Sequence, residues 1–184
     1  MSITEFHEAV VPADLGELLD FDRRIFAQFP EDLFSAEDWS SCRSYWMVVD
    51  GIKVGCCAFE WHVDFGETPR RGCLYIASTG ILPEYQGKGF GRKQKEWEVE
   101  YARQNGFSSI VTNMRESNHR IIRLNEALGF KFRENVPDYY TLPVEAAVVM
   151  ELSVKLHRDA SPQVEVPSAS RGRDPPSHIS RLSP

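Results

Sequence analysis

A glycine-rich turn at residues 83–91, with the sequence PEYQGKGFG, is the part of the chain best suited to bind a ligand. Its glycines stand at alternate positions: Gly87, Gly89 and Gly91. Four cations lie among and just after them: Lys88, Arg92, Lys93 and Lys95. A helix is expected to begin here, and its N-terminus carries a partial positive charge, so each cation is unfavourable by roughly 0.3 to 1 kcal/mol. A polyanion would remove this conflict, because exposed N–H groups would donate to it and the glycines would let the backbone approach it. The spacing therefore predicts a phosphate-binding turn.

Two common phosphate-binding motifs do not fit this turn. A nucleoside-triphosphate loop requires Ser or Thr after Gly-Lys, whereas Gly87-Lys88 is followed by Gly89. A dinucleotide fingerprint requires G-x-G-x-x-G and an acidic residue at the end of the next strand, whereas this turn reads G-x-G-x-G and Asn113 stands near that strand end. A nucleotide-binding regulatory domain is therefore the weakest of the interpretations that stay open.

The sequence that remains is Q-x-x-G-x-G, residues 86–91, preceded by the step Ile81-Leu82-Pro83. Farther on, residues 118–130 read N-x-x-x-x-x-L-x-x-x-x-G-F. Together these motifs resemble the GCN5-related N-acetyltransferase (GNAT) superfamily, whose members use such a turn to hold the pyrophosphate of acetyl-CoA. The resemblance spans about residues 4 to 153 in element order, and its specific motifs lie within 74–130.

The resemblance implies acetyl-CoA as the co-substrate, with an identifiable set of contacts: Thr79, Gly80, Ile81, Gln86, Gly87, Lys88, Gly89, Phe90, Gly91, Arg92 and Asn118. The amides of residues 87–92 would take the pyrophosphate, and free backbone groups of residues 79–81 would pair with the pantetheine arm. The amide of Thr79 would serve as the oxyanion donor. Asn118 would contact the cofactor from the start of a helix, a position that a simple helix cap also explains.

The chain departs from this family where acid and base are expected. Asn125 stands where many members carry a catalytic Tyr, and Tyr75 and Asn113 stand where relatives place a catalytic Glu. An amide has no proton to give at neutral pH, so Asn125 is expected at most to hydrogen-bond the sulfur or the carbonyl. Substitutes can be named: Glu116, Tyr139, Tyr140 and the strand face of Glu60, His62 and Asp64, for which a solvated outer surface is the simpler interpretation. Direct attack by an already neutral amine would need none of them.

The charge distribution indicates the acceptor class. Residues 1–67 hold 14 acids and 4 Lys/Arg, whereas residues 68–131 hold 6 acids and 11 Lys/Arg. The first block interleaves acids with aromatic residues, which suits a cationic amine with an apolar part: Phe29, Glu31, Asp32, Phe34, Glu37, Asp38 and Trp39. The ending DYYTLPVEAAVVMEL is also similar to that of ribosomal-protein alanine N-acetyltransferases.

We therefore expect an N-acetyltransferase whose acceptor is a primary amine, on a peptide N-terminus or on a small molecule. The basic block is too small, on a chain of net charge −6, to indicate nucleic acid, and no membrane partner is expected. A homodimer is left open. A non-catalytic acetyl-CoA-binding module is the main alternative, because the usual acid and base are both missing.

The predicted elements place these residues on a mixed α/β sheet. An apolar helical stripe, interrupted at Asp22, runs along residues 14–26, and Asp50-Gly51 predicts a hairpin turn. A strand over 74–82 leads into the glycine turn, a helix over about 91–105, a strand, a helix over about 118–128 and a final strand. This order predicts a GNAT-like fold, an N-terminal antiparallel hairpin followed by a βαβα acetyl-CoA-binding unit with neighbouring parallel strands.

Composition predicts one domain over residues 1–157 and a disordered tail over 158–184. The tail is rich in Pro, Ser and Arg and has few apolar residues to bury. The N-terminus lacks the basic start and apolar run of a secretion signal, so a cytoplasmic location is expected. The cysteines at 42, 56, 57 and 73 form no C-x-x-C pair and are expected to be reduced, with no metal site.

Overall fold

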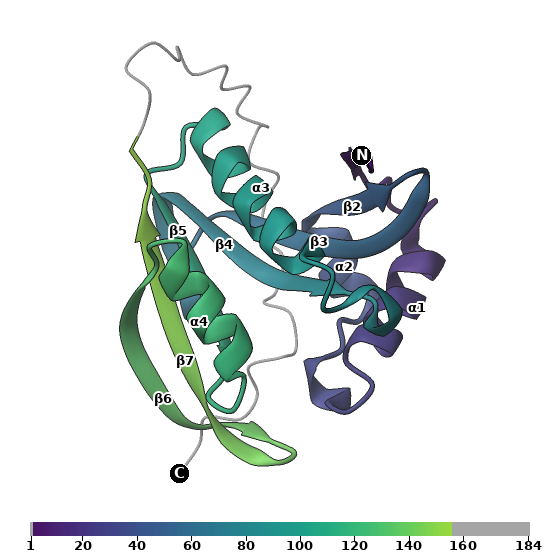
Figure 1. The fold of residues 1–184 in the computed structure, drawn as a ribbon. Helices are drawn as coiled ribbons and strands as arrows, with labels where there is room; N and C mark the ends of the chain where they lie inside the picture. Colours follow the sequence, from purple (N-terminus) through teal and green to yellow (C-terminus); the bar gives the residue numbers. More distant parts are fainter. Residues whose placement is uncertain (1, 156–184) are drawn as a thin grey trace.

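A seven-stranded mixed sheet organises residues 2–155, the part of the chain that the computed structural model describes (Figure 1). The strands are β1 (Thr4–Glu8), β2 (Arg43–Val49), β3 (Ile52–Val63), β4 (Pro69–Ile81), β5 (Ser109–Arg115), β6 (Lys131–Thr141) and β7 (Val144–Ser153). The α-helices are α1 (Leu15–Ile25), α2 (Ala36–Ser41), α3 (Phe90–Gln104) and α4 (His119–Ala127). Short 3₁₀ turns are η1 (Pro30–Asp32), η2 (Phe65–Glu67) and η3 (Pro83–Tyr85). The predicted tail, 158–184, lies outside the described residues, so the predicted domain boundary stays a prediction.

The predicted α/β mixed sheet is confirmed, with one difference in strand order. The order is β1-β2-β3-β4-β5-β7-β6, and β4–β5 is the one parallel pair. The strand that follows α4 does not lie beside β5, because β7 takes the inner position and pairs antiparallel with it. Residues 146–150 of β7 are buried, whereas β6 is largely exposed, so the more apolar strand occupies the inner of the two positions and β6 forms the edge.

The predicted hairpin turn joins β2 to β3. Asp50 and Gly51 both have positive φ, 49° and 80°, as a two-residue turn of the hairpin type requires. Phe59 and Trp61 of β3 face the same side of the sheet, and this alternation then ends. His62 has a φ of 60°, and Phe65 packs beside Tyr75 on the face opposite Phe59.

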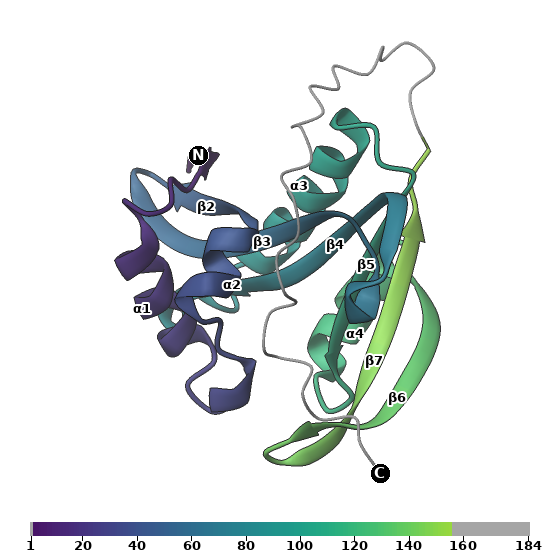
Figure 2. The same ribbon diagram turned by 180° about the vertical axis from the view of Figure 1, so that it is seen from behind.

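Two helical layers cover the sheet. On one face α3 packs on an apolar cluster that includes Phe59, Ile76, Ile110 and Met150, with α4 alongside (Figure 1). On the other face α1 and α2 pack on Trp46, Cys56 and Ala58 through Leu18, Phe21 and Trp39 (Figure 2). All four cysteines are free thiols, and three of them are buried.

The sheet opens between β4 and β5. Their parallel pairing covers Cys73–Ile76 of β4 and ends at the Ile76 and Thr112 pair. Beyond that point β4 continues to Ile81 beside β3, and β5 continues to Arg115 beside β7, so the two strands diverge (Figure 1). A register shift in the β3–β4 pairing falls at the same place. The result is a gap with one closed end and one open end.

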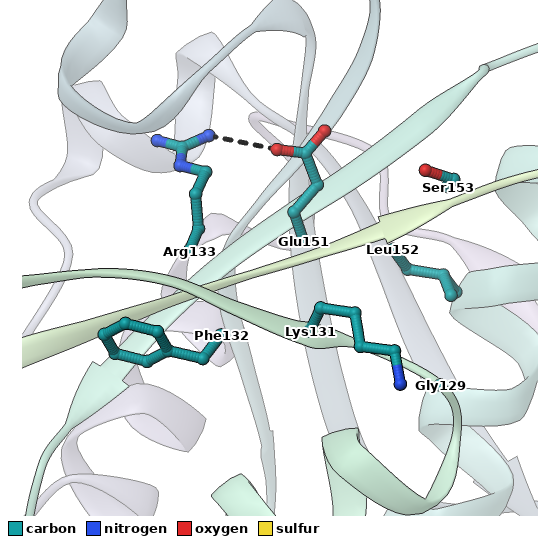
Figure 3. A pocket seen from close by; sticks show the side chains of 7 residues that line it. All are labelled: Gly129, Lys131, Phe132, Arg133, Glu151, Leu152 and Ser153. Carbon is teal, nitrogen blue, oxygen red and sulfur yellow. Dashed lines mark hydrogen bonds and ion pairs between the residues drawn. The ribbon is translucent and has the colours of Figure 1, made fainter.

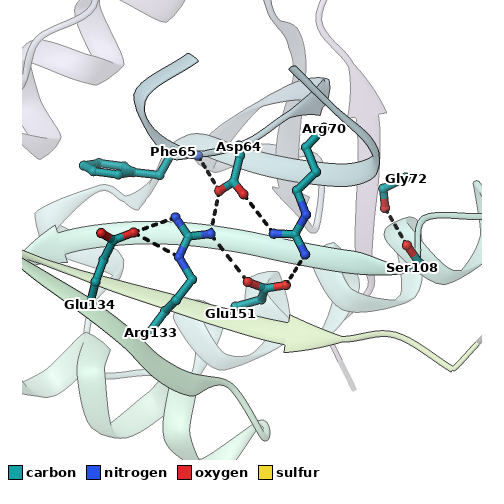
Figure 4. Close-up of polar contacts among 8 residues, drawn as sticks. All are labelled: Asp64, Phe65, Arg70, Gly72, Ser108, Arg133, Glu134 and Glu151. Atoms are coloured by element: carbon teal, nitrogen blue, oxygen red, sulfur yellow. Dashed lines mark hydrogen bonds and ion pairs between the residues drawn. The ribbon is translucent and has the colours of Figure 1, made fainter. Parts of the chain in front are cut away.

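A ring of ion pairs holds the closed end together (Figure 4). Asp64 pairs with Arg70 at 2.8 Å and with Arg133 at 2.6 Å, and Glu151 pairs with the same two arginines at 2.5 Å and 3.4 Å. The four side chains come from the end of β3 and from β4, β6 and β7. Because each carboxylate is shared by both guanidinium groups, the ring ties strands on both sides of the gap.

Candidate active site

The glycine turn presents unpaired backbone donors to open space. Gly87 and Gly89 adopt left-handed φ values of 77° and 84°, and α3 begins immediately after Gly89. Among the described residues, no group accepts a hydrogen bond from the backbone N–H groups of residues 87–92. A Cβ built on Gly87, Gly89 or Gly91 would meet no atom within 4 Å. The turn is thus a backbone cradle with free N–H groups at a helix N-terminus, as an anion requires.

Three of the four predicted cations lie near this cradle, and the fourth does not. Lys88 lies over the ring of Tyr85, and the exposed Arg92 pairs with Glu96 one helical turn away. The prediction was wrong for Lys95, which is 3% exposed and pairs with Glu98 at 2.9 Å inside the protein. Lys95 falls on the inward stripe of α3, formed by Gln94, Lys95, Glu98, Tyr101 and Ala102.

The open edge of β4 also has free backbone groups. The N–H of Leu82 donates to Val54 of β3 at 2.9 Å, and Gly80 and Cys56 are the next opposed pair of the same kind. By the alternation of an antiparallel ladder, the N–H and C=O groups of Thr79 and Ile81 then point away from β3, toward the gap. The side chain of Gln86 donates to the carbonyl of Ile81 at 2.9 Å, as this orientation requires.

Gly80 has a different role from the one expected. The same alternation directs its backbone groups to β3, so a main-chain contact with a ligand in the gap is not favoured there. A Cβ on Gly80 would lie 2.4 Å from Cγ2 of Ile25. Glycine at this position therefore allows α1 to approach the end of β4.

The face of the sheet toward α1 and α2 carries an uncharged hydrogen-bond chain. The hydroxyl of Tyr75 donates to Asn113 Oδ1 at 2.5 Å, and Asn113 Nδ2 donates to the hydroxyl of Tyr140 at 3.1 Å. Burial raises the pKa of both tyrosines, so they stay protonated. Tyr139 is 47% exposed, and its ring lies 5.3 Å from that of Phe65. A neutral chain thus occupies the two positions at which relatives are expected to place Glu.

Arg115, which the sequence did not single out, holds the end of β5. Its guanidinium is 4% exposed, and it pairs with Glu31 at 2.7 Å and Asp32 at 2.9 Å. Although burial opposes ionisation of Glu31, hydrogen bonds from Thr141, Leu142 and Arg115 lower its pKa to about 2. The predicted acidic acceptor surface is therefore partly neutralised, because two of its carboxylates are committed to Arg115.

Asp22 is a buried carboxyl near this region. It is 1% exposed, Oδ2 accepts from the N–H of Phe34 at 2.6 Å, and Oδ1 accepts no hydrogen bond from a described residue. Burial raises the pKa of Asp22 to about 7, against the effect of the Phe34 hydrogen bond and with the help of Asp32 and Asp38. The one signal in the sequence was its interruption of the apolar stripe of α1.

The predicted residues on and before α4 lie apart from one another. Asn118 Oδ1 accepts from the N–H of Ile121 at 3.3 Å, as a helix cap does. Glu116 is exposed before the helix, and its N–H donates to Ala146 at 3.1 Å. The side chain of Asn125 is fully buried, with Nδ2 3.6 Å from the sulfur of Met114 and Oδ1 unpartnered. Their catalytic or cofactor roles stay predictions.

The Glu60, His62 and Asp64 face does not converge on one site. Asp64 belongs to the ion-pair ring, and His62 Nδ1 accepts from the N–H of Gly72 at 3.0 Å. Glu60 lies opposite Tyr75, and burial raises its pKa. Within residues 2–155, no group of three or more His, Cys, Asp or Glu side chains is arranged to hold a metal ion.

A surface hollow of about 440 Å³ lies elsewhere (Figure 3). Its lining comes from β6, β7 and the residue after α4: Gly129, Lys131, Phe132, Arg133, Glu151, Leu152 and Ser153. Ser153 pairs with Ser109, the first residue of β5, whereas the gap opens at the other end of β5. The hollow is therefore separate from the anion cradle and the free edge of β4.

A mixed sheet that opens beside a helix start with free N–H groups is the arrangement expected of an acyl-CoA-dependent acyltransferase. The sequence profile described as "Acetyltransferase (GNAT) family" matches residues 13–130, and the chain belongs to this family. Acetyl-CoA is the co-substrate of this family, and the cradle with its free amides fits it. No helix within residues 2–155 is long and apolar enough to cross a membrane.

Curated relatives of this chain are mycothiol acetyltransferases of low sequence identity. Mycothiol acetyltransferase of Kocuria rhizophila is 30% identical over 128 residues, 61% of this chain and 41% of the relative. That of Thermobifida fusca is 27% identical over 148 residues, 73% of this chain and 46% of the relative. The chain thus spans less than half the length of these curated relatives.

Solved structures share the fold at lower identity. The ribosomal-protein-S18-alanine N-acetyltransferase from Escherichia coli has a TM-score of 0.70 and 20% identity, and the match covers 85% of this chain and 97% of that one. The Salmonella typhimurium protein yncA, solved with its cofactor acetyl-CoA, has a TM-score of 0.65 and 20% identity, with 84% and 96% covered. At these identities the likeness concerns the fold alone.

Proposed function

We propose that this protein transfers the acetyl group of acetyl-CoA to a primary amine by direct attack within a ternary complex. The observation that carries the proposal is the continuity of two backbone surfaces with free groups: the edge of β4 at Thr79 and Ile81, whose N–H groups face away from β3, and the turn at 87–92. One suits the arm of an acyl-CoA and the other suits its pyrophosphate. The family assignment supports the same co-substrate.

Different residues along the gap contact different parts of acetyl-CoA. The N–H groups of residues 87–92 bind the pyrophosphate, with Lys88 and Arg92 adding charge-assisted contacts. Acetyl-CoA supplies an activated thioester, and the N–H of Thr79 donates to its carbonyl oxygen as negative charge develops there. Ile81 contributes main-chain groups to the arm, and Phe90 and Gln86 support the turn around Gly89 and Gly91.

Direct attack is favoured because neutral residues replace the Glu expected as base, and Asn125, which has no proton to give, replaces the Tyr expected as acid. Tyr75, Asn113 and Tyr140 form a closed neutral chain, and Asn125 lies in the interior beside Met114. An amine that has lost its ammonium proton to water attacks the carbonyl carbon, and its nitrogen then gives up a second proton to water. The carbon–sulfur bond breaks and the thiolate of CoA leaves. Tyr139 and Tyr140 border the acceptor side and rank ahead of Glu116 and Asn125 as acceptor contacts.

The acceptor we favour is a cationic primary amine with an apolar part. Glu60 and Glu67 interact electrostatically, Glu60 lies opposite Tyr75, and Phe65 and Tyr139 supply aromatic surface nearby. A peptide N-terminus and a small-molecule amine both fit this description. The names of the relatives add mycothiol-type acceptors to the compounds to test.

The test is release of CoA thiol from acetyl-CoA with a panel of peptide N-termini, small-molecule amines and the acceptor of mycothiol acetyltransferases. Acceptor-dependent thiol release and a product heavier by one acetyl group are expected. Labelled acetyl-CoA added to a cell lysate, followed by mass spectrometry of the products, would identify the natural acceptor. Tight acetyl-CoA binding without acceptor-dependent release from any source would contradict the proposal and favour a non-catalytic binding module.

A further inference from the structure

A polar cluster is buried between α3 and β4 beside the gap. Gln94, Lys95 and Glu98 are 2%, 3% and 0% exposed, on a helix stripe that normally carries apolar side chains. Burial of an ion pair is costly, because both charges lose their hydration, and apolar residues of similar volume often serve stability as well or better. The cluster therefore calls for an explanation other than stability.

The contacts of the cluster converge on Thr79. Its hydroxyl donates to Glu98 Oε1 at 2.6 Å and accepts from Gln94 Nε2 at 2.9 Å. Gln94 Nε2 also donates to the carbonyl of Cys56 on β3 at 2.9 Å, and Lys95 Nζ pairs with Glu98 Oε2 at 2.9 Å. The hydroxyl of Thr79 thus has both a donor and an acceptor partner, and both partners belong to α3.

Thr79 lies where β4 has lost its neighbour on one side. Past Ile76 the strand is supported by β3 alone, so its free edge lacks the hydrogen bonds that fix backbone orientation inside a sheet. The N–H of Thr79 points into the gap, while its side chain points to α3. The hydrogen bonds from α3 to the hydroxyl of Thr79 restrain this part of β4, where hydrogen bonds to β5 are absent.

The same helix also carries the anion cradle. Gly89 and Phe90 begin α3, and Gln94 and Glu98 follow at successive turns of its inner face. A rigid helix that binds the pyrophosphate at its start and holds Thr79 farther along would fix the distance between the two ends of an acetyl-CoA molecule. Lys95 keeps the cluster neutral, so Glu98 adds no net negative charge beside a developing oxyanion.

We propose that Gln94, Lys95 and Glu98 are positioning residues that orient the main-chain N–H of Thr79 toward the thioester carbonyl. The inference rests on the proposed function, in which that N–H is the oxyanion donor. It adds three residues of α3 that act through Thr79 and do not touch the reacting atoms.

The first experiment compares Thr79→Val with Thr79→Ser. Valine keeps the shape but removes both hydrogen bonds, whereas serine keeps the hydroxyl. The readout is the infrared band of carbon-13-labelled acetyl-CoA bound to each protein, because a hydrogen bond to the carbonyl lowers its stretching frequency. The band of Thr79→Val should move toward its position for free acetyl-CoA, and that of Thr79→Ser should stay at the wild-type position.

Affinity and turnover should separate in the same pair. The dissociation constant for acetyl-CoA should stay within about 3-fold of wild type in both variants, since the cradle is intact. Turnover with the best amine of the panel should fall at least about 10-fold in Thr79→Val and little in Thr79→Ser, because a misdirected oxyanion donor acts on kcat.

A second pair removes the charges and keeps the proposal testable if Thr79→Val does not fold. Lys95→Met with Glu98→Gln retains an acceptor for Thr79, whereas Lys95→Met with Glu98→Leu does not. The wild-type carbonyl band should persist in the first double variant and shift in the second. Melting temperatures without ligand report any purely structural contribution.

Two results have different meanings. A wild-type band and wild-type turnover in Thr79→Val and in the Leu double variant would overturn the positioning role, whatever their melting temperatures. Identical bands for free acetyl-CoA and acetyl-CoA bound to the wild-type protein would instead remove the oxyanion role of Thr79, and with it that part of the proposed function.

Discussion

The two walls of the gap between β4 and β5 differ in the atoms that form them. The wall on the β4 side presents main-chain groups of Thr79 and Ile81 and the N–H groups of residues 87–92, with glycines where a side chain would intrude. The wall on the β5 side presents side chains: Asn113 donates a hydrogen bond to Tyr140, and the buried Arg115 pairs with Glu31.

The residues that form each wall also differ in their separation along the sequence. The backbone wall comes from fourteen consecutive positions, 79–92. In the side-chain wall, Arg115 reaches Glu31 across 84 positions, and Glu31 in turn accepts from Thr141, 110 positions away. The backbone wall can form with many different side chains, provided that its glycines are kept. In the side-chain wall, substitutions can change which acceptor binds without changing the fold.

The largest effect is expected from a side chain placed in the backbone wall. Gly91→Asp should weaken acetyl-CoA binding about 100-fold, because a carboxylate would replace the open space and repel the pyrophosphate. Gly91 is preferable to Gly89, whose φ of 84° would strain any other residue. Calorimetric titration measures the effect.

Gly91→Ala is the matched control, and its affinity should fall far less. Both variants should melt at or above the wild-type temperature, because glycine is unfavourable in a helix and Asp suits the first turn. Equal affinities for Gly91→Asp and wild type would refute the cradle.

The next largest effect is expected on the pH dependence of stability, through the buried carboxyl of Asp22. The pKa of Asp22 is about 7 in the folded protein, above its ordinary value of 3.8, so the folded state binds the proton more tightly. Protonated Asp22 stabilises the folded protein fully below its ordinary pKa of 3.8. This contribution to the unfolding free energy is lost as pH rises through the folded-state pKa of about 7. Between pH 5 and pH 8, Asp22→Asn should therefore gain roughly 2 to 3 kcal/mol in unfolding free energy relative to wild type.

Urea unfolding at each pH measures this difference. Asp20→Asn, an exposed Asp-to-Asn change on the same helix, is the matched control, and the pH-dependent gain is expected to be larger for Asp22→Asn. A flat difference for Asp22→Asn would mean that Asp22 is already ionised in the folded protein near pH 5.

A smaller effect is expected from the hydroxyl that ends the neutral chain. If the amine attacks directly, Tyr140→Phe should lower kcat by no more than about 3-fold, with Tyr139→Phe as the matched variant. The measurement is turnover from pH 6 to 9 with acetyl-CoA saturating. A loss of roughly 100-fold in either variant, with cofactor affinity kept, would identify a general acid and contradict direct attack.

The smallest effect on turnover is expected at Asn125. Asn125→Leu removes a buried oxygen that has no described partner, so the melting temperature should stay or rise while turnover changes less than about 2-fold. Asn125→Asp, which puts a charge in the same space, is the contrasting variant and should unfold at a lower temperature. A large loss of turnover in a stable Asn125→Leu protein would restore a catalytic role for this residue.

The sequence by itself determined the backbone wall and the class of sheet. The glycine-cation pattern predicted an anion at a helix start with glycines that let the backbone approach it, and Asp50-Gly51 predicted the hairpin turn. Each of these signals is local, because a turn or a helix start is fixed by the conformational limits of a few neighbouring residues. The chain order of strands and helices likewise indicated a mixed sheet.

Tertiary structure alone decided which side chains meet. Lys95 and Glu98 carry the same charges in sequence as the exposed Arg92 and Glu96, yet one pair is buried and the other lies in solvent, because the helix turns only one face to β4. The exchange of β6 and β7, the commitment of Glu31 to Arg115 and the burial of Asp22 and Asn125 depend in the same way on packing between distant segments. Periodicity can mark the inward face of an element, but the partner on that face is set by the fold as a whole.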